Sequence, residues 1–378
     1  MKRYSCLTRH AASPSSQRGV LVATLLALLL VGCDSGGGTG PARLPIEINP
    51  DAVFAPPTEA ELAAVEVDWS FRTINATSVA EHLETRVTVG GADATVRVVS
   101  HRVPGPEGTE DIKHYGAIIT PDGLAPGGAP VLVYAHGGDS GVSLDDEVLP
   151  LLAVLPDVIT GYVVVVPSFR DEPLSFGGQT WTSEGPASPW DYDVDDALSL
   201  LTVTQQEEPL ADASKTVVLG FSRGAGVGLL MDVRDPRITG VVDFFGPTDF
   251  YGQFVQDVFQ EALDGQPRDL PGLDVLNTRF IQPLSDGDLS LGIMRLELAR
   301  RSPVLWAGEL SRVQVHHGTS DTIVPISQSQ SLSARMAGIG RSAPEYEAFF
   351  YAGGAHDPFT LSGSFSRARE FLLAILSQ

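Results

Sequence analysis

A serine between two glycines is the first feature of the sequence that could do chemistry. Ser222 lies in the stretch GFSRG (220–224), which fits the pattern G-x-S-x-G, with an apolar run before it and a run of small residues after it. In that context the pattern is typical of a tight turn from a strand to a helix, which leaves the serine hydroxyl exposed. The alternative is a turn with no chemical role. We expect Ser222 to be a nucleophile.

A serine hydroxyl needs a base, and the base needs an acid to orient it. His356 follows the last predicted strand, and Asp321 follows the strand before it. Both therefore come at the carboxyl ends of strands, where a parallel sheet collects its functional residues. The chain order Ser222, Asp321, His356 is the one that this architecture requires. Asp249, which follows the strand after the nucleophile, is an alternative acid.

Backbone N–H groups must also be available to stabilise a developing oxyanion. One is expected from Arg223, directly after the nucleophile. The other is expected from Gly137 or Gly138 in the sequence HGGD, which follows the apolar strand 129–135. Glycines let the backbone approach a substrate closely, although two adjacent glycines also occur in plain turns. The sequence does not decide between Gly137 and Gly138.

Neither a metal nor a cofactor is expected. Four acids, Asp191, Asp193, Asp195 and Asp196, gather near the start of a predicted helix. They lack the central glycine and the terminal glutamate of a calcium-binding loop. We interpret them as the acidic start of the helix at 191–206, where negative charge is favourable.

The elements that must position these residues follow an α/β pattern. Two strands joined by a glycine turn (84–100) and a third (114–123) come first, and apolar strands then alternate with helices. Such apolar strands, buried on both faces, indicate a parallel sheet covered by helices. The remaining strands are expected at 129–138, 161–169, 216–221, 238–247, 312–318 and 346–354, and the helices at 58–67, 145–155, 191–206, 223–231, 327–337 and 364–376. Helical pieces are expected at 250–301.

The first 32 residues are typical of a secretion signal, with basic residues followed by the apolar run 20–31. Cys33, placed after Leu-Val-Gly, resembles the lipidation site of bacterial lipoproteins; an ordinary signal peptide is the alternative. We expect a lipid on Cys33, a flexible tether at 33–57 and one domain at 58–378. The expected location is the bacterial cell envelope. Because the only other cysteine, Cys6, lies in the signal, no disulfide can form within the mature chain.

The formal net charge of −22 limits the partners of the chain. Such an acidic surface repels nucleic acid and anionic lipid. We therefore expect no nucleic-acid partner, and we expect the lipid on Cys33 to hold the protein at a membrane. The expected partner of the site is a small molecule.

From about residue 84 to its end, the chain resembles the α/β-hydrolase fold and, within it, the catalytic domain of the prolyl oligopeptidase family. The resemblance rests on four stretches that occur in this order: AHGG, GFSRG, SPVLWAGELSRVQVHHGTSDTIVP and YAGGAHDP. It implies a mostly parallel sheet of eight strands with helices on both faces. It also implies a Ser222–His356–Asp321 triad in a serine-type peptidase or carboxylesterase.

Two departures from that family bear on the substrate. About 50 residues separate the signal from the first strand, too few for the family's β-propeller, and residues 250–302 are expected to form a small helical lid. A tyrosine often assists the family's oxyanion hole, but Tyr134 is not in the matching register. A site without a propeller suits an ester or a short peptide. The alternative is a catalytically silent, lipid-anchored binding protein on the same scaffold.

Overall fold

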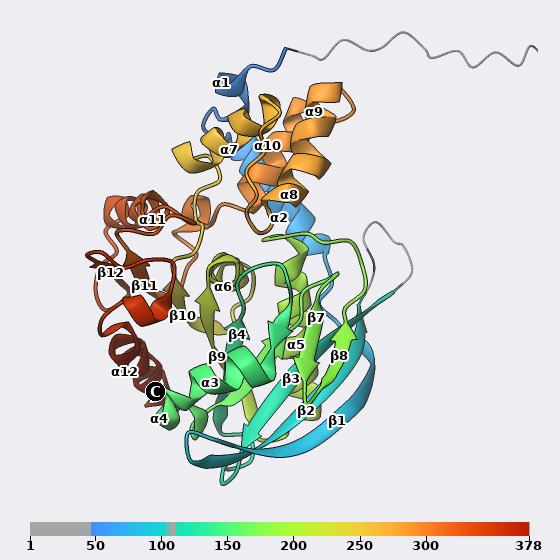
Figure 1. Ribbon diagram of the computed structural model, residues 1–378, viewed down its shortest axis with the longest axis vertical. Helices are drawn as coiled ribbons and strands as arrows, with labels where there is room; N and C mark the ends of the chain where they lie inside the picture. Colours follow the sequence, from blue (N-terminus) through green and yellow to red (C-terminus); the bar gives the residue numbers. More distant parts are fainter. Residues whose placement is uncertain (1–46, 104, 106–110, 378) are drawn as a thin grey trace, which may run out of the picture. The chain divides into compact units, whose positions relative to one another are not determined.

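The computed structural model describes residues 47–103, 105 and 111–377. The expected signal at 1–32, Cys33 and the tether up to residue 46 lie outside the described residues. The main feature of the described part is a mixed sheet of nine strands (Figure 1). The strands in their spatial order are β1 (Thr77–Val89), β2 (Ala92–Val103), β3 (Ile112–Pro121), β6 (Val163–Pro167), β4 (Ala129–Ala135), β9 (Ala211–Phe221), β10 (Ile238–Phe244), β11 (Arg312–Gly318) and β12 (Tyr346–Tyr351).

The pairing of the strands changes from antiparallel to parallel at β6. Strands β1, β2, β3 and β6 pair antiparallel, whereas β6, β4, β9, β10, β11 and β12 pair parallel. The expectation of a largely parallel sheet is thus confirmed for the part from β6 to β12. The number of eight strands that the resemblance implied is wrong: the nine strands placed from the sequence, including the hairpin of β1 and β2 at one edge, all belong to this sheet. The carboxyl ends of β4, β9, β10, β11 and β12 all lie at the same edge.

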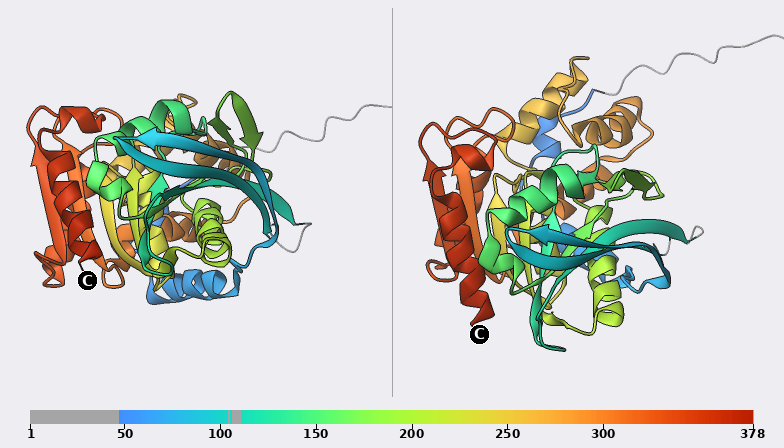
Figure 2. Two further views of the ribbon diagram at one scale, coloured as in Figure 1. Left: turned by 90° about the horizontal axis from the view of Figure 1, so that it is seen from below. Right: turned by 60° about the horizontal axis from the view of Figure 1, so that its bottom comes forward.

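Helices cover both faces of the sheet, as expected (Figure 2). Within β4 the buried side chains alternate: Val131 and Val133 belong to one hydrophobic cluster, Leu132 and Tyr134 to the other. This alternation is the two-residue period of a strand. The first face is covered by α5 (Tyr192–Glu207), α6 (Arg223–Arg234) and α11 (Ser327–Gly338), and the second by α3 (Leu149–Ala153), α4 (Pro156–Ile159) and α12 (Ser364–Leu376).

A second, small sheet was not expected from the sequence. It consists of β5 (Val142–Ser143), β7 (Pro173–Phe176) and β8 (Gln179–Thr182), strands that are too short to show a hydrophobic period. The helix expected at 145–155 is also broken. It begins as a π-helical turn, η2 (Leu144–Val148), in which the Leu149 N–H donates to the Leu144 carbonyl, and continues as α3, near whose start lies Pro150.

A helical insertion separates β10 from β11, in the region where the sequence predicted a lid. It contains α7 (Gln253–Leu263), α8 (Leu273–Leu276), η3 (Asn277–Ile281), α9 (Gln282–Asp286) and α10 (Leu291–Arg300). In Figure 1 these helices gather near α1 (Pro50–Val53) and α2 (Glu59–Phe71), above the sheet. No helix of the described ranges is both long and apolar enough to cross a bilayer.

One arginine of the insertion binds the N-terminal segment. Arg295 in α10 donates to both carboxylate oxygens of Glu61, at 2.6 and 2.8 Å. It also donates to four successive or nearby backbone carbonyls, those of Ala52, Val53, Ala55 and Pro56. Residues 50–57, which we expected in the tether, are therefore packed against the domain.

Candidate active site

The backbone at Ser222 is strained. Ser222 lies between the end of β9 and the start of α6, with φ +51° and ψ −119°. A residue other than glycine in such a conformation costs about 1–3 kcal/mol, so the surrounding structure must impose it. The Ser222 N–H donates to the Phe244 carbonyl at 2.9 Å and fixes the turn to β10. This is the strand-to-helix turn that the G-x-S-x-G pattern predicts.

The two glycines of the pattern are required by close contacts. A Cβ at Gly220 would lie 2.5 Å from the Cα of Ala225, and one at Gly224 would lie 2.0 Å from the carbonyl oxygen of Ala135. Both contacts are with backbone, which cannot move aside as a flexible side chain could. The glycines therefore let α6 start directly against β9 and β4.

The structure brings the predicted base and acid together. The His356 Nδ1 donates to Asp321 Oδ2 at 2.7 Å, and the N–H groups of Ile323 and Val324 donate to Asp321 Oδ1 at 2.9 and 3.0 Å. His317 Nε2 lies 3.3 Å from Oδ2. Burial opposes ionisation of Asp321, but the hydrogen bonds from His317 and His356 hold its pKa well below the usual range. The carboxylate is therefore ionised at neutral pH.

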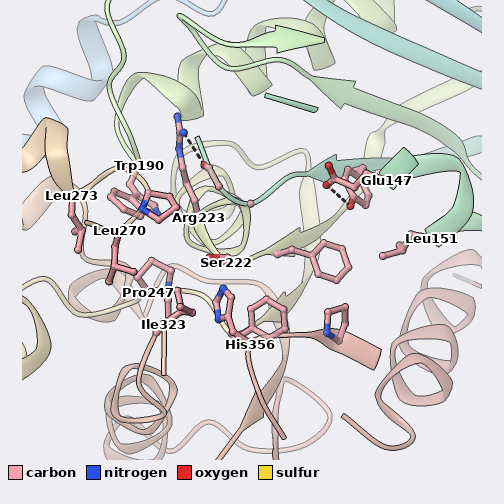
Figure 3. Close-up of a pocket in the computed structure, with 18 of the residues that line it drawn as sticks. Glu147, Leu151, Trp190, Ser222, Arg223, Pro247, Leu270, Leu273, Ile323 and His356 are labelled. Carbon is pink, nitrogen blue, oxygen red and sulfur yellow. Dashed lines mark hydrogen bonds between the residues drawn. The ribbon is translucent and has the colours of Figure 1, made fainter. Parts of the chain in front are cut away.

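The imidazole of His356 packs against the ring of Phe245, with the two centroids 4.3 Å apart. Figure 3 shows it directed toward Ser222, and both residues line the same cavity. Asp249, the alternative acid, is engaged elsewhere. Its carboxylate accepts from the Ser331 hydroxyl at 2.5 Å and from the Tyr251 N–H at 3.0 Å. The geometry thus favours Asp321.

The expected oxyanion donors line that cavity too. Arg223 is the first residue of α6, so its N–H has no partner within the helix. Gly137 and Gly138 lie opposite, and Gly138 has φ +71°, a conformation that favours glycine. A Cβ on Gly137 would be 3.1 Å from the Cβ of Ser222, so this loop passes close to Ser222.

The acidic cluster lies at the start of a helix, as expected, with Asp193 and Asp195 in the first turn of α5, but it also has a role that was not expected. Asp191, at the start of α5, makes no capping hydrogen bond with its side chain. Instead, the acids pair with arginines: Asp191 with Arg72, Asp193 with Arg223, Asp195 with Arg72 and Arg234, and Asp196 with Arg170. Across the part of the chain that the structure describes, no group of His, Cys, Asp and Glu side chains is arranged to hold a metal ion.

The sequence did not predict that the side chain of Arg223 and its partner Glu172 lie beside the glycine loop of the site. Arg223 is only 2% exposed, and its guanidinium contacts Glu172, Asp193 and the Gly138 carbonyl. The sequence does hold one sign of this, because an arginine in the first turn of a helix that is expected to pack against a buried strand must find a counterion. Which acid provides it cannot be read from the spacing.

The cavity over Ser222 has a volume of about 580 Å³. Its walls are mainly apolar, and the segment 250–273 supplies one side of it. This side consists of Phe250, Phe254, Val255, Leu270, Pro271 and Leu273. Tyr134 lies in another part of the wall, where its hydroxyl donates to Glu147 at 2.8 Å (Figure 3). The site is thus a mainly apolar cavity, with Ser222 and His356 in one part of its wall and the Tyr134–Glu147 pair in another.

No protein-family model and no curated protein sequence matches the chain. Solved structures do resemble it. A puromycin-hydrolyzing peptidase from Mycobacterium tuberculosis matches with a TM-score of 0.52 and 21% identity over 75% of this chain, which spans only 39% of that peptidase. Acetyl xylan esterase 1 from Thermoanaerobacterium sp. matches with a TM-score of 0.53 and 18% identity, covering 85% of this chain and 95% of that one.

An acetyl xylan esterase from Paenibacillus sp. R4 matches with a TM-score of 0.54 and 15% identity, over 86% of this chain and 98% of that one. At these identities the likeness concerns the fold. The described part of the chain therefore shares the α/β fold of these α/β-hydrolase-type esterases and the peptidase, in line with the resemblance that its motifs indicate.

Proposed function

We propose that the protein is a serine hydrolase that cleaves an ester or a short peptide or amide bond through a Ser222–His356–Asp321 triad. The observation that carries the proposal is the 2.7 Å hydrogen bond from His356 to Asp321 at a cavity that the strained Ser222 also lines. An activated serine needs both a base and an acid that orients the base. All three are present in one place.

The proposed reaction follows from the proton positions. Because Asp321 accepts from Nδ1, the neutral imidazole of His356 has its lone pair on Nε2, where it can take the proton of Ser222. The serine oxygen then attacks the substrate carbonyl, and the carbonyl oxygen becomes an oxyanion facing the N–H groups of Arg223 and the glycine loop. His356 gives its proton to the leaving group. Water then releases the acyl group by the same steps.

The substrate class is supported less directly. The apolar wall and the helical insertion over the serine suit a small substrate with an apolar part. The similar structures include two acetyl xylan esterases and a puromycin-hydrolyzing peptidase, so ester and amide cleavage both occur on this fold. We therefore propose an esterase or a peptidase for short substrates, similar to the catalytic domain of prolyl oligopeptidases without a propeller.

Labelling with a fluorophosphonate probe tests this proposal. The wild-type protein should be labelled, Ser222→Ala should not, and Ser214→Ala, which changes an exposed serine at the start of β9, should be labelled like the wild type. Panels of p-nitrophenyl esters and aminoacyl p-nitroanilides would then separate esterase from peptidase. A folded wild-type protein that takes no label would instead support the silent binding protein.

We also propose that the protein is attached to the bacterial cell envelope by a lipid on Cys33, which lies outside the described residues. The sequence pattern around Cys33 is the support for this location. In a bacterial host, wild-type protein should incorporate an alkyne-tagged palmitate and Cys33→Ser should not. Equal incorporation by both proteins would contradict the proposal.

A further inference from the structure

A buried polar cluster lies behind the glycine loop of the candidate active site. Its centre is the guanidinium of Arg223, which donates to Asp193 through Nε and Nη2 at 2.7 and 2.9 Å. Its Nη1 donates to the Gly138 carbonyl at 3.0 Å, a bond drawn as a dashed line in Figure 3. The same Nη1 also donates to Glu172 Oε1. The side chain of the residue after the nucleophile thus reaches across to the loop that faces the nucleophile.

Two consecutive peptide groups of that loop are held by their carbonyls. His136 Nδ1 donates to the Gly137 carbonyl at 3.0 Å, and Arg223 holds the Gly138 carbonyl. In a trans peptide the N–H points away from the C=O of the same unit. Fixing the Gly137 carbonyl therefore fixes the direction of the Gly138 N–H. This identifies Gly138, rather than Gly137, as the residue whose N–H is set by the cluster.

The imidazole of His136 is itself fixed from two sides. Its ring stacks on Phe169 with the centroids 4.5 Å apart, and its Nε2 lies 3.7 Å from Glu172 Oε2. Because Nδ1 donates to a carbonyl, the neutral ring has only a lone pair at Nε2. Both Nε2 and Oε2 are buried, and neither has a hydrogen-bond partner among the described residues. An unprotonated Nε2 and an ionised carboxylate would thus face each other as two hydrogen-bond acceptors. One of the two groups must carry a proton for a hydrogen bond to form between them.

Counting charges shows that this pair must hold one proton, which the count alone allows on either Glu172 or His136. The positive Arg223 is already balanced by Asp193, which is fully buried, accepts from the guanidinium at both carboxylate oxygens and accepts from the Trp190 N–H at Oδ2. Other charged groups that act on Glu172 are Arg223 itself, Asp193 and Asp139. An ionised Glu172 would leave one unbalanced negative charge in a buried cluster, which is costly.

His136 is fully buried, and the positive guanidinium of Arg223, which contacts Glu172, disfavours a second positive charge on the imidazole. Burial raises the pKa of Glu172 to about 7, and burial lowers the pKa of His136 to about 3. The proton between them therefore resides on the carboxyl of Glu172, and His136 stays neutral.

We propose that Glu172 is a positioning residue whose protonated carboxyl donates to His136 Nε2 and thereby holds the Gly138 N–H in place for the oxyanion, while Arg223 fixes the next peptide group of the loop through the Gly138 carbonyl. The inference rests on the proposed function in one respect, the use of this loop as the oxyanion hole. The gap of 3.7 Å closes to a hydrogen bond by a small rotation of the carboxyl. The cluster would then be neutral, and His136 Nε2 and Glu172 Oε2 would each have a hydrogen-bond partner.

The kinetic test compares two substitutions at one position. Glu172→Gln keeps an N–H for His136 and an oxygen for Arg223, so kcat should stay within about threefold of wild type, whereas Glu172→Ala should lower kcat by about 10- to 100-fold with little change in KM. Wild-type kcat should decline as the pH rises through about 7, where Glu172 loses its proton. Glu172→Gln should lack that decline. The control is Glu207→Gln, an exposed site at the end of α5.

A wild-type kcat in Glu172→Ala, or an unchanged alkaline decline in Glu172→Gln, would overturn the inference. A readout that needs no turnover separates it from the proposed function. In spectra of protein with ¹⁵N-labelled histidine, the His136 Nε2 signal should move between pH 5.5 and 8.5 in the wild type and stay fixed in Glu172→Gln. His136→Gln assigns the signal. A wild-type Nε2 signal that does not move would contradict the proposal even if Ser222 reacts with fluorophosphonate.

Discussion

Asp321→Asn should lower kcat by about 10⁴-fold while leaving KM nearly unchanged. In the wild type the carboxylate accepts the Nδ1 proton of His356 at 2.7 Å. An amide that presents its NH₂ group at this position forces the His356 proton onto Nε2, which leaves no lone pair for the Ser222 hydroxyl. Steady-state hydrolysis of a p-nitrophenyl ester measures the effect.

Asp249→Asn is the matched control for this experiment. Asp249 is the other acid that the sequence offered, and its carboxylate is bound to Ser331 and Tyr251. Its substitution should change kcat by less than about threefold, because Asp249 contacts none of the three reacting residues. If Asp249→Asn were the inactive variant and Asp321→Asn the active one, the assignment of the acid would be reversed.

Gly224→Ala should abolish both the native turn and the activity. The added methyl would lie 2.0 Å from the Ala135 oxygen, 2.3 Å from its carbonyl carbon and 2.5 Å from the His136 oxygen. Relieving this clash requires α6 to move away from β4, which separates Ser222 from the oxyanion loop. We expect a loss of stability above the usual 1–3 kcal/mol for overpacking, about 4 kcal/mol or more, or no folded protein. Thermal unfolding measures the loss of stability, and fluorophosphonate labelling measures the loss of reactivity at Ser222.

Gly338→Ala shows what the same change does where space is free. Gly338 ends α11, and a Cβ there would have no neighbour within 4 Å. Alanine in a helix is favoured over glycine by about 0.5–1 kcal/mol, so this variant should unfold at the same or a slightly higher temperature. If Gly224→Ala behaved like Gly338→Ala, the close packing at the start of α6 would not be required.

The parts of the fold and site that could be predicted are those with local signals. The strain at Ser222 follows from five adjacent residues, GFSRG, and the buried strands follow from continuous apolar runs. His356 and Asp321 could be placed because each comes directly after such a strand. By contrast, β7 and β8 have four residues each, and a period of two cannot be recognised in so short a run.

Contacts between distant segments could not be predicted. Arg223 is joined to Asp193, 30 residues away, and to Glu172, 51 residues away, and neither spacing has a local meaning. For the same reason the acids near Asp191 could be recognised only as a helix start, whereas the arginines that they also bind come from three other segments. Residues 50–57 looked like a tether because their partner, Arg295, lies far along the chain.

The bonds of Arg295 have a consequence for the order in which the chain folds. They connect residues that are 234 to 243 positions apart. Closing a loop of that length costs about 5 kcal/mol of chain entropy, because the cost grows as 1.5 RT ln n. Such a contact forms only after the intervening sheet has drawn its two ends together. During synthesis the N-terminal segment therefore cannot dock on α10 until most of the chain has left the ribosome. Its docking is a late folding event.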